Sequence, residues 1–153
     1  MPEPRKFQSI TASLGTTKQQ SFEDLYGAPE NFLEVKVDNP KTHGTSRSMY
    51  TDYEIICRTN IPTFKLQESS VRRRYSDFDA FKDYLDRELA VSLPSLPSKV
   101  FTGRFDEKVI EERRKGLEDF ISVVASHPLI QTRASVHLSS FLQGANWDKS
   151  SLG

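Results

Sequence analysis

Apolar side chains change their spacing at residues 72–78, the stretch Arg-Arg-Arg-Tyr-Ser-Asp-Phe. Upstream they alternate with polar ones, which is typical of half-buried β-strands, and downstream they recur at helical intervals. A run of strands followed by a run of helices predicts an α+β fold. The chain has 153 residues, enough for one domain with a sizeable core and too few for two comfortable ones.

Three strands are predicted upstream of this stretch. They are expected at residues 31–37, 50–59 and 63–75, the last with an interruption near residues 67–70. Asn39-Pro40 should end the first strand, and residues 41–48 should then form a polar loop. The short links between the strands indicate an antiparallel meander.

Three helices are predicted downstream. They are expected at residues 77–89, 106–126 and 134–142. Ser76 is a suitable N-cap for the first helix, and His127-Pro128 should end the second. The prolines of Leu93–Lys99 exclude a helix there, because each restricts its predecessor to extended geometry.

The folded domain is expected to span residues 28–145. Residues 1–27 are polar without a sustained period, so we expect a disordered N-terminal arm there and a flexible tail at residues 146–153. No run of about 20 apolar residues and no apolar signal segment occurs. The single cysteine, Cys57, cannot form an internal disulfide, which favours a reducing compartment. We expect a cytoplasmic protein that meets membranes, if at all, at their surface.

The formal charge of the chain is balanced, with 21 Lys and Arg against 21 Asp and Glu. Its overall field therefore attracts neither nucleic acid nor membrane, and a bound anion must be met by a local cluster. Arg72–Arg74 form such a cluster beside a predicted helix start, where backbone N–H groups and the helix dipole also favour negative charge. The alternative is a solvated basic turn.

Arg113 falls within the apolar face of the long predicted helix. An inward-facing arginine is costly unless its charge is paired. It could form a salt bridge or extend to solvent, or it could line a pocket whose counter-charge is a ligand. If Arg113 lines a pocket, then Arg74, Lys99 and Arg113 together suit a ligand with two phosphates and several hydroxyls, and Tyr75 offers a flat face for the ring of that ligand.

Three segments together resemble the PX (phox-homology) domain family. Arg73–Phe78 resembles its R-R-Y-x-x-F signature, and Leu93–Lys99 resembles its apolar-P-x-x-P-x-K loop. Arg113 falls where the family carries its second pocket arginine. The resemblance covers about residues 28–145, and the chain is similar to the PX-only sorting nexins of the sorting-nexin-3 type. It implies a three-stranded antiparallel β-sheet packed against a bundle of three to four helices.

The resemblance also implies a ligand, phosphatidylinositol 3-phosphate. Arg74 would hold the 3-phosphate, and Tyr75 would stack under the inositol ring. Lys99 would meet the 1-phosphate, and Arg113 would bind the 4- and 5-hydroxyls. The family further implies a peripheral protein of the early endosome, with the Golgi as a further compartment. There it would sort transmembrane cargo with retromer subunits, which the N-terminal arm would contact.

A loop beside the predicted pocket offers a membrane anchor. Val100, Phe101 and Phe105 are apolar, and Lys99 and Arg104 flank them. Inserting one phenylalanine would contribute about 1.5–3 kcal/mol. This would add to the headgroup contact, because a single weak anchor rarely holds a protein on a membrane. Alternatively, these residues cap the core beneath the loop.

Ser76 is a candidate regulatory phosphosite. The sequence Arg-Arg-x-Ser resembles a site for basophilic kinases. A phosphate on Ser76 would place nearly two negative charges beside the pocket and is expected to expel the lipid.

Two other functions would use the same residues. A protein-interaction module would present the proline-rich loop to SH3 domains and the basic turn to phosphopeptides. A nucleic-acid binder would use Arg72–Arg74 with Tyr75, but zero net charge argues against it. His43, His127 and His137 lack companions at ligand spacing, and no catalytic or phosphate-loop motif occurs. We therefore expect no metal, no cofactor and no enzymatic activity.

Overall fold

The computed structural model describes residues 30–99 and 103–152. The predicted arm over residues 1–27, and Val100 and Phe101 of the predicted anchor, lie outside the described residues. The description below concerns the compact unit that begins at Phe32.

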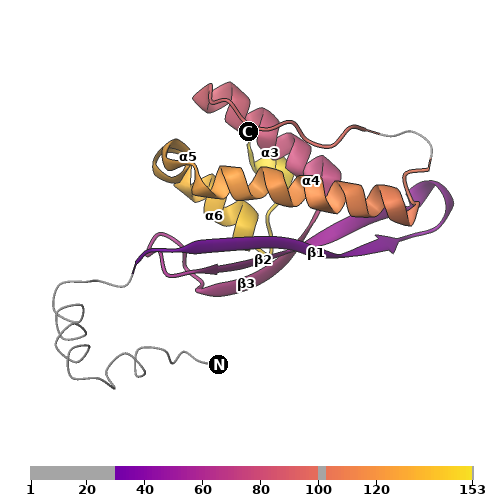
Figure 1. Ribbon diagram of the computed structural model, residues 1–153, viewed down its shortest axis with the longest axis horizontal. Helices are drawn as coiled ribbons and strands as arrows, with labels where there is room; N and C mark the ends of the chain where they lie inside the picture. Colours follow the sequence, from indigo (N-terminus) through magenta and orange to yellow (C-terminus); the bar gives the residue numbers. More distant parts are fainter. Residues whose placement is uncertain (1–29, 100–102, 153) are drawn as a thin grey trace, which may run out of the picture. The chain divides into compact units, whose positions relative to one another are not determined.

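Three antiparallel strands form one sheet in the order β1-β2-β3 (Figure 1). The strands are β1 (Leu33–His43), β2 (Tyr50–Thr59) and β3 (Glu68–Arg74). In the central strand, the alternate residues Tyr53, Ile55 and Cys57 are buried, as the period of two requires. The predicted three-stranded meander is confirmed.

The first strand does not end at Asn39-Pro40, as the sequence predicted. Its pairing with β2 shifts register between Asp38 and Lys41, and Asn39 adopts a φ of 48° within this bulge. A bulge tolerates a proline, which has no N–H to give to the ladder, and Asn is among the residues that reach positive φ most readily. Pairing resumes at Lys41, so part of the predicted loop 41–48 is strand, and the turn contains η1 (Ser46–Ser48).

The third strand is shorter than predicted, because it begins at Glu68 rather than at residue 63. Just before it, the backbone of Leu66 is held by a side chain. The Gln143 amide nitrogen donates to the carbonyl of Leu66 at 2.7 Å, and the N–H of Leu66 donates to the Gln143 oxygen at 3.3 Å. This contact comes from the far end of the chain and has no local sequence signal.

The helices lie on one face of the sheet (Figure 1). They are α3 (Tyr75–Leu89), α4 (Glu107–Ser126), α5 (Pro128–Arg133) and α6 (Ser135–Gln143). His127-Pro128 ends α4 as predicted, but it also starts α5, which the sequence analysis missed. Proline suits the first turn of a helix, and the His127 side chain accepts a hydrogen bond from the N–H of Leu129.

The first helix begins at Tyr75, so Ser76 is not its N-cap. Ser76 lies within the first turn, and the carboxylate of Asp77 accepts a hydrogen bond from the N–H of Arg74 at 2.8 Å. The chain therefore passes directly from strand to helix between Arg74 and Tyr75. This change of direction frees the two side chains from the alternation of a strand, and both can reach the same side.

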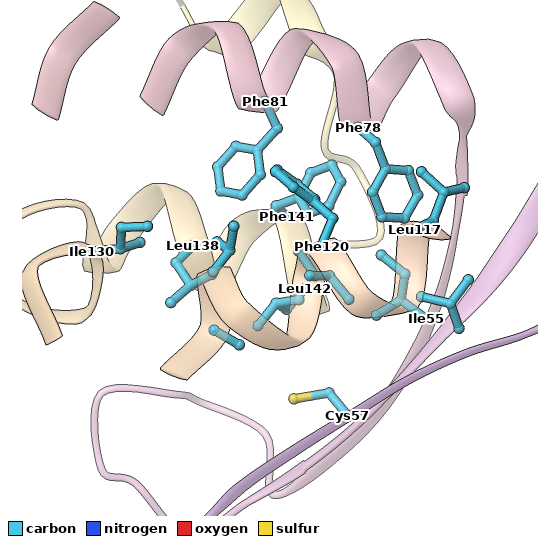
Figure 2. Close-up of a cluster of buried hydrophobic side chains, with 14 of the residues drawn as sticks. Ile55, Cys57, Phe78, Phe81, Leu117, Phe120, Ile130, Leu138, Phe141 and Leu142 are labelled. Atoms are coloured by element: carbon cyan, nitrogen blue, oxygen red, sulfur yellow. The ribbon is translucent and has the colours of Figure 1, made fainter. Parts of the chain in front are cut away.

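The core fills the space between the sheet and the helices. Figure 2 shows Phe78 and Phe81 of α3 pointing towards Phe141 of α6. The ring of Phe141 stacks on Phe81 with centroids 4.4 Å apart and meets Phe78 edge-on at 5.2 Å. Leu117 and Phe120 of α4 are fully buried in the same cluster. The expected packing of helices on a sheet is confirmed.

The C-terminal segment was expected to be a flexible tail over residues 146–153, but residues 147–152 fold against the domain. Trp147 meets the ring of Phe141 edge-on, with centroids 4.9 Å apart. The short helix η2 (Lys149–Leu152) follows, and Leu152 is buried. The small apolar content of this segment gave no periodic signal.

Candidate functional site

A cleft of about 420 Å³ lies where several segments remote in sequence meet. The turn between β1 and β2 and the start of α4 lie at the same end of the molecule (Figure 1). The end of β3, the start of α3 and the loop before α4 complete the walls. All four residues that were predicted to bind a headgroup line this cleft: Arg74, Tyr75, Lys99 and Arg113.

Arg74 lies on the face of a tyrosine. Its guanidinium carbon is 4.2 Å from the centre of the Tyr50 ring. Among the described residues, no acidic side chain forms an ion pair with Arg74. A cation–π contact holds the charge without using the N–H donors of the guanidinium, so these donors remain for an anion.

Arg113 also lies on the face of a tyrosine, and its Nε is buried without a partner. Its guanidinium carbon is 4.3 Å from the centre of the Tyr75 ring. Within the described part of the chain, Nε has no hydrogen-bond acceptor and the guanidinium has no ion-pair partner. The alternative that Arg113 forms a salt bridge is therefore wrong, as far as the described residues go. A buried unpaired donor is costly, and the arginine that carries it lines the cleft.

The neighbouring Arg114 shows the contrast. It pairs with Glu111 at 2.8 Å and with Glu118 at 3.6 Å, and it donates to the carbonyl of Val37 at 2.9 Å. The hydrogen bond to Glu111 raises the pKa of Arg114 and lowers that of Glu111. Two adjacent arginines on one helix thus differ completely: Arg114 is satisfied by protein groups, and Arg113 is not.

Lys99 faces a carboxylate across the cleft. Its Nζ is 3.5 Å from Oδ2 of Asp79, and the two side chains are 64% and 34% exposed. Asp79 was not predicted as a site residue. The signal was available, because Asp79 follows Tyr75 by four residues on the same helix and therefore shares its face.

Tyr75 connects the helix to the proline-rich loop. Its hydroxyl donates to the carbonyl of Pro97, two residues before Lys99. Burial raises the pKa of Tyr75 and Asp79 raises it further, whereas Arg113 and Lys99 lower it. The loop also touches α4 at Gly116, where an added Cβ would lie 2.4 Å from Cγ of Pro97. The position of Lys99 therefore depends on contacts from two helices.

The three arginines of the basic turn have three different environments. Arg72 pairs with Asp52 at 2.7 Å on the sheet. Arg73 is 4% exposed and donates to the carbonyls of Ser140 and Phe141 at the end of α6. Arg74 lines the cleft. The basic cluster expected from the sequence is thus one cleft residue beside two structural ones.

Several further residues line the cleft. Arg104 and Phe105, from the predicted anchor, are both present, and the Arg104 guanidinium carbon is 4.9 Å from the Phe105 ring centre. Phe105 is half-buried and does not belong to the described core cluster, which argues against its capping the core. Ser76 lines the cleft as well. The sequence analysis missed Arg47 and Tyr50, whose positions depend on how the turn between β1 and β2 folds.

The histidines have ordinary surroundings. His43 bonds to Asp52 at 3.0 Å and stacks on Tyr50, and His137 packs on Tyr84. Over residues 30–99 and 103–152, no group of three or more His, Cys, Asp or Glu side chains is placed to hold a metal ion. No described helix is both long enough and apolar enough to cross a bilayer.

The sequence matches the family model described as "PX domain" over residues 61–145. It is 58% identical over 149 residues to "Sorting nexin-3" of Gibberella zeae, covering 97% of this chain and 91% of that protein. It is 62% identical over 138 residues to "Sorting nexin-3" of Neurospora crassa, covering 90% and 96% of the two chains. A third relative, "Sorting nexin-3" of Schizosaccharomyces pombe, is 60% identical over 127 residues, covering 82% and 88%.

Solved structures with a similar fold agree with this. A designed CISK-PX domain superposes with a TM-score of 0.61 at 31% identity, covering 72% of this chain and 98% of that one. The PX domain of mouse SNX19, in a structure with bound sulphate, superposes with a TM-score of 0.54 at 19% identity, covering 76% and 100%. At that identity the second match shows the fold alone.

Proposed function

The chain belongs to the PX-domain family, among the sorting nexins of the sorting-nexin-3 type, and on this premise we propose that it is a non-catalytic membrane adaptor that binds phosphatidylinositol 3-phosphate. One observation supports this most directly. Arg113, whose buried Nε has no partner among the described residues, lines the same cleft as Arg74 and Lys99. Three cations around one cleft suit a headgroup with two phosphates and vicinal hydroxyls.

The proposed roles follow the chemistry of each side chain. Arg74 binds the 3-phosphate, because its donors are not used by any described carboxylate. Arg113 offers its guanidinium to the ring hydroxyls, and Lys99 exchanges Asp79 for the 1-phosphate. Tyr75 supports the inositol ring and holds the loop that carries Lys99.

The rim of the cleft suits attachment to a lipid surface. Arg104 is exposed beside the half-buried Phe105, and the apolar pair Val100 and Phe101 precedes them in sequence. We propose that Phe105, Val100 and Phe101 enter the interface while Arg104 stays among the headgroups. The headgroup contact and the apolar loop are two weak anchors, and together they can hold the protein on a membrane where one of them alone could not.

The cellular role proposed here follows the relatives named sorting nexin-3. The protein would act at the cytoplasmic face of the early endosome, with the Golgi as a second compartment, and would sort transmembrane cargo together with retromer. The lipid would provide the location, and the N-terminal arm would provide a contact with the coat.

The rival role as an SH3 ligand is disfavoured by the loop itself. Leu93 and Leu96 pack against the hydrophobic core, and the carbonyl of Pro97 accepts a hydrogen bond from Tyr75. An SH3 domain needs a free polyproline face. Here the apolar side chains and a carbonyl are used within the domain.

Sedimentation with vesicles tests the proposal. Wild type, Arg74→Ala and Arg113→Ala are compared on phosphatidylcholine vesicles with and without phosphatidylinositol 3-phosphate. Each variant removes a charge-assisted contact worth about 1.5–3 kcal/mol, so each should weaken binding about 10-fold or more. Arg87→Ala, an exposed arginine of α3 paired with Glu88, is the matched control and should bind as wild type does. Equal binding to vesicles without the phosphoinositide would contradict the proposal.

A further inference from the structure

Asp79 is an acidic residue in a cleft lined by cations. The cations are Arg47, Arg74, Lys99, Arg104 and Arg113. Asp79 is half-buried and is held on α3 one turn after Tyr75. An anion inside an anion-binding cleft reduces affinity for any anionic ligand, so its presence calls for a physical account.

The contact between Asp79 and Lys99 is weak. Their charged atoms are 3.5 Å apart, Lys99 is 64% exposed, and an exposed ion pair of this kind contributes little to stability. A phosphate, with its greater charge, can therefore take Lys99 from Asp79. The carboxylate itself stays in place, because its short side chain is fixed to a helix. Its field reaches the tyrosine platform as well, since Asp79 helps to raise the pKa of Tyr75.

We propose that Asp79 is a specificity-determining residue, which excludes inositol headgroups carrying more phosphates than the two the cations can neutralise. The inference rests on the proposed function, because it concerns which members of that ligand class enter the cleft. The five cations and Asp79 leave the cleft a net charge of about +4, which two phosphates with nearly two charges each already balance, so a further phosphate on the ring meets the repulsion of Asp79 without a cation left to offset it. With nearly two charges on each phosphate, Coulomb repulsion at about 8 Å, screened as in bulk water, amounts to about 1 kcal/mol and disfavours each additional phosphate about fivefold.

An alternative role for Asp79 predicts a change of the opposite sign. If Asp79 only held Lys99 in place for the ligand, then removing its charge would loosen Lys99 and weaken binding of every headgroup. If Asp79 repels surplus phosphate, removing its charge strengthens binding, most of all for the headgroup with more phosphates. The direction of the change therefore separates a positioning role from an excluding one.

Calorimetry with soluble headgroups provides the test. Wild type, Asp79→Asn and Asp83→Asn are titrated with inositol 1,3-bisphosphate and inositol 1,3,5-trisphosphate. Asp83 is exposed one turn further along the same helix and is not among the residues lining the cleft, so its variant changes net charge equally. We expect Asp79→Asn to bind both headgroups more tightly and to shift the ratio of affinities about fivefold towards the trisphosphate. Asp83→Asn should leave this ratio as in wild type.

A second background separates the field of Asp79 from its contact with Lys99. In Lys99→Gln, the substitution Asp79→Asn should still shift the ratio towards the trisphosphate, because the repulsion acts on the ligand directly. A shift that disappears in this background, an unchanged ratio, or weaker binding by Asp79→Asn would overturn the inference while leaving the proposed function intact. If wild type binds neither headgroup, the proposed function and the inference both fail.

Discussion

The arginines of this chain are supported in two different ways. Those that hold the fold together bind protein oxygens, as Arg72, Arg73 and Arg114 do. Two of the cleft arginines lie instead on tyrosine rings, Arg74 on Tyr50 and Arg113 on Tyr75. An aromatic face attracts the charge but does not occupy the N–H donors. This difference in partners separates ligand-ready arginines from structural ones.

Arg73 should be far more important for stability than its neighbour Arg72. Its guanidinium is buried between Phe141 and Trp147, and it satisfies backbone carbonyls at the end of α6. Arg73→Ala leaves those carbonyls buried and unpaired, so we expect a loss of about 3 kcal/mol or more in the free energy of unfolding. Arg72→Ala breaks a partly exposed pair and should lose about 1 kcal/mol. Urea unfolding measures both, and equal losses would contradict this assignment.

A negative charge at Ser76 should weaken headgroup binding without weakening the fold. Ser76 lies in the first turn of α3 and lines the cleft. The helix dipole favours a negative charge at this position, but that charge repels the phosphate of a bound ligand. We expect Ser76→Asp to lower affinity for inositol 1,3-bisphosphate at least about 10-fold with an unchanged or higher melting temperature. Ser76→Ala should bind like wild type, and normal binding by Ser76→Asp would refute the phosphosite prediction.

The site could be predicted in part because its cations stand out from the sequence pattern. Arg113 interrupts an apolar helix face, Arg74 lies near the end of a predicted strand, and Lys99 ends the proline-rich loop. All three could therefore be predicted as site residues. Arg47 lies within the turn between β1 and β2, and Tyr50 begins β2 directly after it, and nothing local marks either as a site residue. Asp79 was not predicted as a site residue, because its pairing with Lys99 depends on the path of the loop before α4.

The long helix α4 connects the edge of the sheet to the cleft. On one side Glu118 accepts a hydrogen bond from the N–H of Val37 at 3.1 Å, and Arg114 donates to the carbonyl of Val37. These bonds cover backbone groups that an edge strand would otherwise expose to another chain. On the other side the same helix presents Arg113 to the cleft and Gly116 to the proline-rich loop. The helix thereby fixes the cleft relative to the sheet.

Gly116 should be required for the position of Lys99. An added Cβ would lie 2.4 Å from Cγ of Pro97, and the rigid proline ring cannot turn away. In Gly116→Ala the loop must move, which breaks the hydrogen bond from Tyr75 to Pro97 and displaces Lys99. We expect overpacking to cost about 1–3 kcal/mol, reduced by the gain of about 1 kcal/mol in helix propensity.

The affinity of Gly116→Ala for inositol 1,3-bisphosphate should fall to that of Lys99→Gln. Calorimetry compares the two variants with wild type. Glu112→Ala, an exposed position on the same helix, is the control for effects of the substitution on α4 itself. Wild-type affinity in Gly116→Ala would show that Lys99 is positioned independently of this contact.

Local periodicity predicted the elements well where each packs through one regular face. Strand β2 and helix α4 agree with the predicted ranges, because their buried residues follow periods of 2 and 3.6. The continuation of β1 past Pro40, the start of α5 at Pro128 and the folded segment after Gly144 were missed. The continuation of β1 depends on pairing with β2, and the last segment depends on Trp147, which lies against Phe141 and under the guanidinium of the distant Arg73. The start of α5 has local signals, Pro128 and the His127 cap, which the sequence analysis took only as the end of α4.

The core and the cleft share the same elements, and this joins stability to binding across the whole domain. Strand β2 places Cys57 in the core and Tyr50 in the cleft. Helices α3 and α4 likewise each carry side chains that are buried in the core and side chains that line the cleft. An opening large enough to expose Cys57 must therefore also take the cleft apart. A ligand of the cleft should oppose that opening, although it binds far from the thiol along the strand.

The single cysteine allows a direct measurement of this coupling. Cys57 is fully buried, and burial raises the pKa of its thiol, so a thiol reagent reacts through the open form alone. Inositol 1,3-bisphosphate at 100 times its dissociation constant should stabilise the closed form by about 2.7 kcal/mol and slow the labelling about 100-fold. Arg74→Ala at the same ligand concentration should show much less slowing. Labelling that ignores the ligand in wild type would mean that β2 opens locally, with the cleft still assembled.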